Sequence, residues 1–339
     1  MSTRLKDIAA LTGVSPTAVS YVLNGRAAKV GKLTREKVLR AADRLGYRPN
    51  GAARAVREGR HGAVALIMSP FAHRSLLAPE LMSGIHRELS RHNLRLLVDY
   101  IADEHLTSET TLPRLLRERA CDGMLLNYHA HVPPMLAELT ERFRLPTVWL
   151  NARQDFNSVY PDDFGAAKLA TETLLSEGRR RVAYVDSTYN DAIANGNFHF
   201  SKRDRRAGYE AAMQAAGLPV ELIFDETAAP SRRENIAAFH AQLLARFQRR
   251  RPAPPDAIVC YGGWDLGVLR QIQTQLNLDL AILSFGIGDS ALNNQLTRGL
   301  IVPLEEIGAR AVTMLLRRLE NSAPIPSEVI PFRWVDASR

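Results

Sequence analysis

The spacing of apolar residues divides the chain into two parts with different secondary structure. Up to about residue 50, apolar side chains recur three and four positions apart, which predicts short helices with one apolar face each. From residue 62, short apolar runs alternate with helical stretches, which predicts parallel strands covered by helices on both faces. The predicted helices span residues 4–11, 16–24 and 33–45. The predicted strands span residues 64–68, 94–100, 123–128, 147–150, 182–185, 220–224, 257–260 and 280–285.

The first two predicted helices carry the start and stop signals of a helix-turn-helix. Thr3 is the expected N-cap of the first helix, and Gly13 lies in the turn that follows it. Ser15 is the expected N-cap of the second helix, Pro16 occupies its favoured first position, and Gly25 ends it. Two short helices joined by a glycine-containing turn form a helix-turn-helix, whose second helix enters the major groove of DNA.

Positive charge is concentrated in this helical part. Residues 1–60 hold thirteen Lys and Arg against four Asp and Glu, a net charge of +9. The remaining residues hold 31 basic against 32 acidic side chains, a net charge of −1. A basic head on a neutral body is expected of a protein that binds a polyanion through its head. Charge and helix pattern together predict a DNA-binding module.

Several short motifs in the first fifty residues resemble the DNA-binding head of the lactose-repressor (LacI) family. They include Lys6-Asp-Ile-Ala, Gly13-Val-Ser, Val22-Leu-Asn-Gly25 and Leu45-Gly-Tyr-Arg-Pro-Asn50. The resemblance implies an all-α helix-turn-helix head at residues 1–49, a hinge helix at 50–61, and a two-lobed α/β domain with parallel sheets, like periplasmic binding proteins, at 62–339. It also implies a homodimer on a pseudopalindromic double-stranded DNA operator. A small-molecule effector, a sugar or sugar-derived acid, would control operator affinity.

The same resemblance assigns DNA contacts to individual residues. Pro16, Thr17 and Tyr21 match positions that read bases in the family. Tyr21 stands where most members have Arg, so a different half-site preference is expected, because a phenol lacks the paired donors with which Arg reads guanine. The alternative is that Tyr21 only packs on the DNA backbone. The other assigned head positions are Thr3, Lys6, Ser15, Ser20, Asn24 and Tyr47.

The segment after the head matches the family's hinge helix, which enters the minor groove when two copies meet. Asn50, Ala53 and Val56 are the matching DNA contacts. Val56 takes the place of a leucine that wedges between base pairs, and a shorter wedge is expected to kink DNA less. The alternative for this segment is a plain linker.

In the body, the resemblance implies two lobes between which the chain crosses three times. The first lobe is expected to hold residues 62–160 and 291–320. The second lobe is expected to hold residues 161–290 and 321–339. Ligands of such folds bind at the carboxyl ends of the strands, in the cleft between the lobes.

Five residues are candidates for the effector site. Arg205 matches an arginine that grips ligand oxygens through its paired donors, although it could instead form an ion pair that stabilises a lobe. Asp162 matches an acid that accepts ligand hydroxyls or braces the hinge, and Phe71 is either a stacking wall or a core residue. Near the third expected ligand position the sequence departs from the family pattern. Either Trp264 or Asp265 takes the place of the pocket aspartate there.

Other classes of protein are disfavoured. No catalytic set, metal-type spacing or nucleotide fingerprint stands out, so neither an enzyme nor a cofactor is expected. Cys121 and Cys260 lie in or beside apolar runs and are expected to be inert buried thiols. No apolar run approaches the ~20 residues that span a bilayer, and no leader pattern opens the chain, so a cytoplasmic protein without a membrane partner is expected. A solute-binding protein without a DNA role is the alternative that the body alone would allow.

Overall fold

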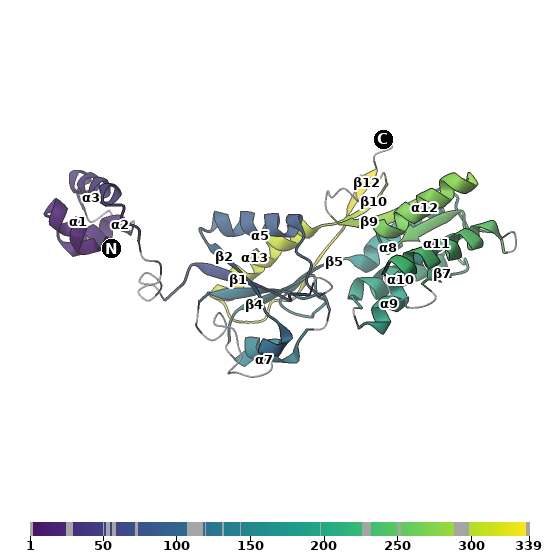
Figure 1. The fold of residues 1–339 in the computed structure, drawn as a ribbon, viewed down its shortest axis with the longest axis horizontal. Coiled ribbons are helices and arrows are strands. Elements are labelled where there is room, and N and C mark those ends of the chain that lie inside the picture. Colours follow the sequence, from purple (N-terminus) through teal and green to yellow (C-terminus); the bar gives the residue numbers. More distant parts are fainter. Residues whose placement is uncertain are drawn as a thin grey trace. The chain divides into compact units, whose positions relative to one another are not determined.

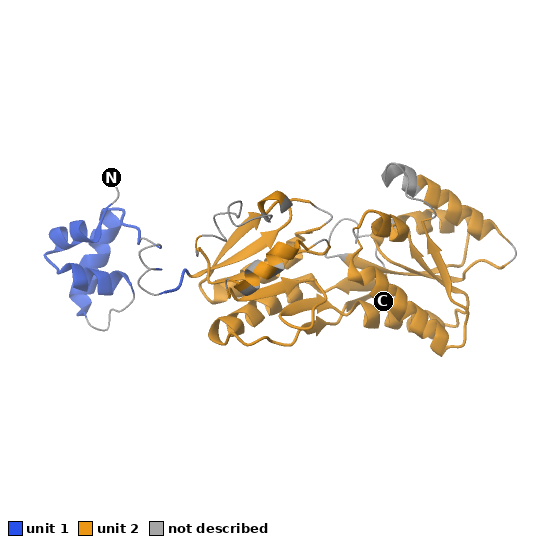
Figure 2. Ribbon diagram, turned by 90° about the horizontal axis from the view of Figure 1, so that it is seen from below, with its two compact units in different colours: residues 1–61 blue, residues 62–339 orange. Residues whose placement is uncertain are grey.

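The computed structural model divides the chain into two compact units, residues 1–61 and 62–339 (Figure 2). Within the described residues, no helix is long and apolar enough to cross a membrane. The described residues are 3–24, 30–49, 51, 55, 59–71, 74–106, 118, 120–130, 132–142, 144–196, 198–225, 232–249, 252–287 and 298–336.

In its described part, the first unit is a bundle of three short helices (Figure 1). They are α1 (Leu5–Thr12), α2 (Pro16–Leu23) and α3 (Lys32–Arg44), and they match the predicted helices to within one residue at each end. Gly13 ends α1 with a φ of 65°, a left-handed conformation that favours glycine. The three helices bury a shared core of Ile8, Val19, Val22, Val38, Ala41 and Ala42.

The first helix does not begin as predicted, because Thr3 is not its N-cap. The Thr3 hydroxyl donates instead to the Leu45 carbonyl oxygen at 2.8 Å. Arg4 is the N-cap residue, and its backbone N–H donates to the Asp7 carboxylate at 2.8 Å. A carboxylate at the third helical position can reach back to the backbone donors at the helix start, so Asp7 supplies the cap. Thr3 ties the start of the bundle to the end of α3.

The described residues of the second unit form two six-stranded sheets. The first sheet has the order β11-β5-β4-β3-β1-β2, and its strand pairs are parallel. Helices α5 (Pro79–Arg91) and α13 (Leu304–Glu320) pack together on one face, and α7 (Pro134–Arg142) covers the other (Figure 1). The strands are β1 (Ala63–Met68), β2 (Arg95–Tyr100), β3 (Gly123–Asn127), β4 (Thr147–Leu150), β5 (Ser158–Pro161) and β11 (Glu328–Ile330), with a 3₁₀ turn at Asp103–Leu106.

The second sheet has the order β12-β10-β9-β8-β6-β7, and β12 is antiparallel to β10. Helices α8 and α10 cover one face, and α11 and α12 cover the other. The strands are β6 (Val182–Asp186), β7 (Glu221–Phe224), β8 (Ala257–Cys260), β9 (Ala281–Ile287), β10 (Arg298–Val302) and β12 (Arg333–Asp336). The helices are α8 (Asp163–Ser176), α9 (Tyr189–Ala194), α10 (Phe200–Ala215), α11 (Arg232–Gln248) and α12 (Gly263–Leu276).

A glycine fixes the position of α10, the helix that carries Lys202 and Arg205. A Cβ atom on Gly208 would lie 2.2 Å from the Phe164 carbonyl oxygen of α8. Only glycine lets two helix backbones approach this closely. The close packing therefore fixes the first turn of α8 relative to the first turn of α10. Both first turns carry charged side chains.

The predicted lobe boundaries are wrong in two places. Strand β10, predicted in the first lobe, pairs in parallel with β9 of the second sheet. Strand β11, predicted in the second lobe, pairs in parallel with β5 of the first sheet. Such short runs carry too little pattern to show which sheet edge they join. Within the described residues, the chain crosses between the lobes from β5 to α8, from β10 to α13, and from β11 to β12.

Candidate functional sites

The start of α2 presents its first residues outward. The Ser15 hydroxyl accepts a hydrogen bond from the backbone N–H three residues later at 3.3 Å, and Pro16 fills the first helical position, as predicted. Val19 and Val22 are buried in the core of the unit, which leaves Pro16 and Thr17 exposed. This end of the helix is free to enter a groove of DNA.

The other predicted DNA residues of the head divide into exposed and internally bonded ones. Lys6 is exposed, whereas Tyr21 and Tyr47 are partly buried. The Asn24 amide donates to the carbonyl oxygen of Ser20 at 2.7 Å and to its hydroxyl oxygen at 3.1 Å. This pair stabilises the carboxyl end of α2. The predicted hinge contacts lie outside the described residues: Asn50, Ala53 and Val56.

In the body, Arg205 is buried beside the carboxyl end of β8. Its Nε donates to Asp163 Oδ1 at 2.6 Å, and its Nη1 donates to the Tyr261 carbonyl oxygen at 2.7 Å. The guanidinium also lies 4.4 Å from the ring centroid of Phe285 and 4.8 Å from that of Tyr261. Arg205 thus forms the lobe-stabilising ion pair that the sequence left open as an alternative.

Two neighbouring acids at the crossover into α8 have different environments. Asp162, the predicted site residue, caps α8 by accepting a hydrogen bond from the Gly165 N–H at 2.9 Å. Asp163, which the sequence analysis did not single out, is 1% exposed and pairs with Arg205. Burial raises the pKa of Asp163 to about 6, and the attraction of Arg205 offsets only part of this effect.

The remaining predicted effector residues are spread over both lobes. Phe71 follows β1, is 46% exposed, and lies with its ring centroid 5.0 Å from the Arg74 guanidinium. Asp265 lies in the first turn of α12 and is buried inside the second lobe. Burial and the nearby charge of Asp186 raise the pKa of Asp265 to about 7. The side chain of Trp264 lies outside what the structure describes.

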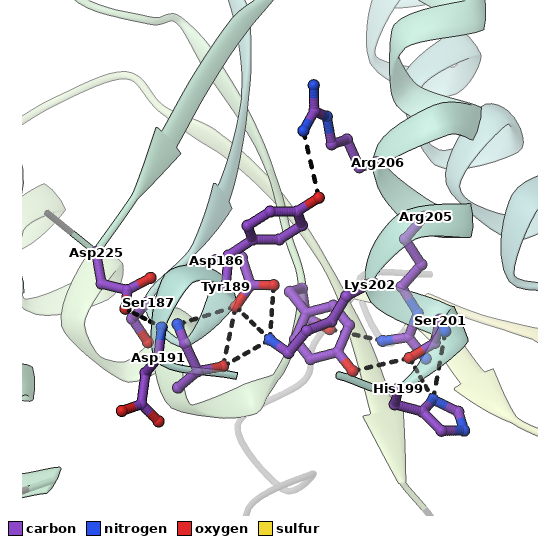
Figure 3. A network of polar contacts seen from close by, with 12 residues as sticks. Asp186, Ser187, Tyr189, Asp191, His199, Ser201, Lys202, Arg205, Arg206 and Asp225 are labelled. Carbon is purple, nitrogen blue, oxygen red and sulfur yellow. Dashed lines mark hydrogen bonds and ion pairs between the residues drawn. The ribbon is translucent and has the colours of Figure 1, made fainter. Parts of the chain in front are cut away.

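A second buried ion pair joins Lys202 of α10, one turn before Arg205, to Asp186 at the end of β6 (Figure 3). The Lys202 ammonium donates to both carboxylate oxygens of Asp186 and to the Thr188 hydroxyl, each at 2.8 Å. The same ammonium lies 4.0 Å from the ring centroid of Tyr261. Sequence analysis missed this pair, although Asp186 directly follows a predicted strand, the usual place for site residues in parallel sheets.

Three polar residues at strand ends of the first lobe were also missed. Asn127 ends β3, His129 follows it, and Asn151 follows β4. The Asn151 amide nitrogen lies 3.0 Å from His129 Nδ1, and the Asn127 amide donates to the Leu76 carbonyl oxygen at 3.0 Å. Shielding from solvent lowers the pKa of His129 to about 4, so the ring is neutral near pH 7.

Ten buried side-chain polar atoms of the two lobes lack a hydrogen-bond partner within the described structure, and four of them belong to residues at or just after the ends of β3, β4 and β5. These four are Asn127 Oδ1, Asn151 Oδ1, His129 Nε2 and Asp163 Oδ2. Buried polar atoms in proteins are nearly always hydrogen-bonded, so a group of exceptions at the strand ends marks a place where a ligand could supply the partners.

Metal and thiol chemistry find no support in the described part of the chain. No three His, Cys, Asp or Glu residues gather there as metal ligands would. Cys121 and Cys260 are buried free thiols, as predicted. Burial raises the pKa of Cys121 to about 11 and that of Cys260 further, so both stay protonated near pH 7.

Comparisons with known proteins identify both units. Residues 4–50 match the model of bacterial regulatory proteins of the lacI family, and residues 171–336 match a periplasmic binding protein-like domain. The HTH-type transcriptional regulator RafR of Escherichia coli is 30% identical, over 75% of this chain and 71% of RafR. The ribose operon repressor of Escherichia coli (strain K12) is 26% identical, over 93% of this chain and 92% of that repressor. The Lac repressor dimer bound to operator and the anti-inducer ONPF shares the fold, with a TM-score of 0.73 at 20% identity over 99% of this chain and 98% of that chain.

A helix-turn-helix unit followed by a two-lobed α/β unit defines a DNA-binding transcription regulator with an effector-binding domain. The chain belongs to the LacI family of bacterial regulatory proteins. The predicted fold class and function are therefore confirmed, and the relatives are transcriptional regulators rather than enzymes. The alternative of a solute-binding protein without a DNA role is wrong, because the matched relatives share the DNA-binding head as well as the body.

Proposed function

We propose that this regulator is a cytoplasmic repressor that binds a pseudopalindromic operator as a homodimer and changes its operator affinity when an effector binds between the lobes. Residues 1–49 form the DNA-binding domain in this proposal, and residues 50–61 form the hinge. The observation that carries the DNA half is the exposed start of α2 on a head with a net charge of +9 over residues 1–60. By linkage, the operator must change effector affinity by the same factor as the effector changes operator affinity.

In this proposal Pro16, Thr17 and Tyr21 read bases, and Lys6 neutralises a phosphate. The operator for these tests is a duplex selected by the parent protein from random sequence. Replacing Tyr21 with Ala should weaken binding to this operator by about tenfold, which corresponds to about 1.4 kcal/mol, while binding to non-operator DNA stays as before. Replacing Lys6 with Ala should weaken both kinds of binding alike and lower the slope of log affinity against log salt by about 1. Fluorescence anisotropy at several salt concentrations measures both effects.

The pair of variants separates two roles for Tyr21. Tyr21→Ala would behave like Lys6→Ala if Tyr21 packed only on the DNA backbone. The operator proposal itself would be contradicted if neither the parent nor the variants bound specifically to any duplex selected from random sequence.

For the effector, we propose a neutral polyhydroxylated molecule such as a sugar, held by Asn127, His129 and Asn151 of the first lobe and by Asp163 of the second. Three of the four unpartnered buried atoms at the strand ends are acceptor oxygens, and an unpaired buried acceptor costs about 1–3 kcal/mol that a ligand hydroxyl would relieve. A sugar-derived acid is less suitable, because its carboxylate would face the Asp163 carboxylate. The ribose operon repressor among the relatives supports a sugar.

Thermal unfolding with matched pairs of sugars and their aldonic acids tests this proposal. A neutral sugar at 100 times its dissociation constant should add about 2.7 kcal/mol to the free energy of unfolding, and its acid should add none. Asn151→Ala should lose the stabilisation and still bind operator. Stabilisation by the acid alone would contradict the assignment of the acceptor oxygens.

A further inference from the structure

Helix α10 of the second lobe, together with its N-cap residue His199, makes several side-chain contacts with the first lobe in the described structure. His199 contacts Asn151 through a hydrogen bond of 3.1 Å and His129 through rings 5.5 Å apart. Phe200 contacts Tyr160 through rings 5.7 Å apart, and Asp204 contacts Arg153 through an ion pair of 2.5 Å. The Arg153 side chain is 52% exposed. An ion pair with such an exposed partner contributes little to holding the lobes together. The contacts of His199 and of Phe200 differ in their distance from the crossovers.

The order of strands in the first sheet sets how far each contact lies from the crossovers between the lobes. The crossover strands β5 and β11 lie at one edge, followed by β4 and then β3. Tyr160 lies in β5 itself, whereas Asn151 follows β4 and His129 follows β3. In a hinge motion, displacement grows with distance from the hinge. Opening of the lobes therefore separates the contacts of His199 before that of Phe200.

On its own lobe, His199 is anchored at a strand two places away from the crossover strand β10. Its Nδ1 lies 2.8 Å from the Ser201 hydroxyl, which lies 2.8 Å from the Tyr261 hydroxyl (Figure 3). Tyr261 follows β8, and β9 separates β8 from the crossover strand β10. The cations of Lys202 and Arg205 both lie against the Tyr261 ring, 4.0 Å and 4.8 Å from its centroid. The His199 ring is thus tied to the interior of the second lobe.

The hydrogen bonds of His199 fit a neutral ring. The Asn151 carbonyl oxygen can only accept, so Nε2 carries the proton and Nδ1 accepts, including from the Ser201 backbone N–H at 3.3 Å. Shielding from solvent lowers the pKa of His199 to about 3, so this arrangement persists near pH 7. The ring also meets the His129 ring of the first lobe edge-on, with centroids 5.5 Å apart.

We propose that His199 latches the two lobes together in the absence of effector, through its hydrogen bond to the Asn151 carbonyl and its ring contact with His129. The latch goes beyond effector recognition, because it needs no ligand. It also meets the candidate effector site at Asn151, whose backbone accepts from His199 and whose side-chain oxygen lacks a partner in the described structure. Closure of the lobes and recognition of the effector would therefore both involve Asn151.

Spin labels on the effector-free, full-length protein test the latch. Cysteines replace the exposed Ser90 of α5 and Gln214 of α10, one in each lobe, and pulsed electron resonance measures the distance between labels in dimers diluted with unlabelled protein. The native cysteines are buried. His199→Phe keeps a ring but removes the donor, so the ratio of separated to closed lobes should rise about threefold to tenfold, the usual worth of one hydrogen bond. His199→Gln keeps an N–H donor and should stay near the parent ratio.

Glu210→Gln, further along α10 and paired with Arg206 of the same helix, is the matched control and should leave the distances unchanged. If folded His199→Phe has the distance distribution of the parent, the latch proposal is overturned. Should His199→Phe not fold, Ser201→Ala frees the same ring from Tyr261. It must then increase the separated fraction, and an unchanged distribution would equally overturn the proposal.

Discussion

Replacing Arg205 with Met should lower the free energy of unfolding of the body by about 3–5 kcal/mol at pH 8, because it leaves the Asp163 carboxylate buried without its counter-charge. The Asp163 side chain is 0% exposed, and its Oδ1 accepts from Arg205 at 2.6 Å. Urea unfolding of the full chain, followed by tryptophan fluorescence, measures this change. All three tryptophans, at positions 149, 264 and 334, lie in the second unit, so the signal reports the body alone.

The next residue on the same helix provides the control. Arg206 pairs with Glu210 at 2.7 Å with a side chain that is 36% exposed, so Arg206→Met should cost less than about 1 kcal/mol. The double variant Asp163→Asn with Arg205→Met should recover most of the lost stability, since no charge of the pair remains buried. If Arg205→Met costs no more than Arg206→Met, the buried pair does not stabilise the lobe. A loss of effector response in Arg205→Met alone would not separate a ligand contact from a damaged lobe.

Replacing Asp265 with Asn should change how stability depends on pH. The pKa of Asp265 is raised from 3.8 to about 7 in the folded protein, so the folded state binds this proton more tightly than the unfolded chain. Between those two pH values the free energy of unfolding of the parent falls by about 1.4 kcal/mol for each pH unit as pH rises, as far as this group is concerned. The asparagine variant lacks this loss. Its advantage over the parent should therefore grow by about 2 kcal/mol between pH 5 and pH 7 and level off above about pH 8.

Urea unfolding of parent and variant at half-unit steps of pH measures this difference. Asp279→Asn is the control, because Asp279 is 88% exposed and its pKa is lowered by Arg179, so any small pH effect should have the opposite sign. A constant difference between Asp265→Asn and parent across the range would mean that Asp265 is ionised throughout.

The effector site shows how far single residues can be placed from sequence. Asp162 and Asp163 are neighbours, and the exact start of α8 decides which of them is buried: Asp162 becomes its cap, and Asp163 points to Arg205. The family resemblance led to Arg205 but not to its partner. His129 and Asn151 gave no local signal beyond following a predicted strand, because their importance lies in contacts with the other lobe.

The sequence by itself determined the two-unit organisation, the three helices of the head, eight of the strands and the DNA-binding role. Capping residues, apolar spacing and charge act between residues a few positions apart, so they can be read directly from the chain. The tertiary structure alone decided which sheet receives β10 and β11, which acid pairs with Arg205, and which histidine bridges the lobes. Those outcomes depend on hydrogen bonds and burial between residues far apart in sequence, such as Asp163 with Arg205 and Asn151 with His199, and no local pattern encodes which distant partner a polar group will meet.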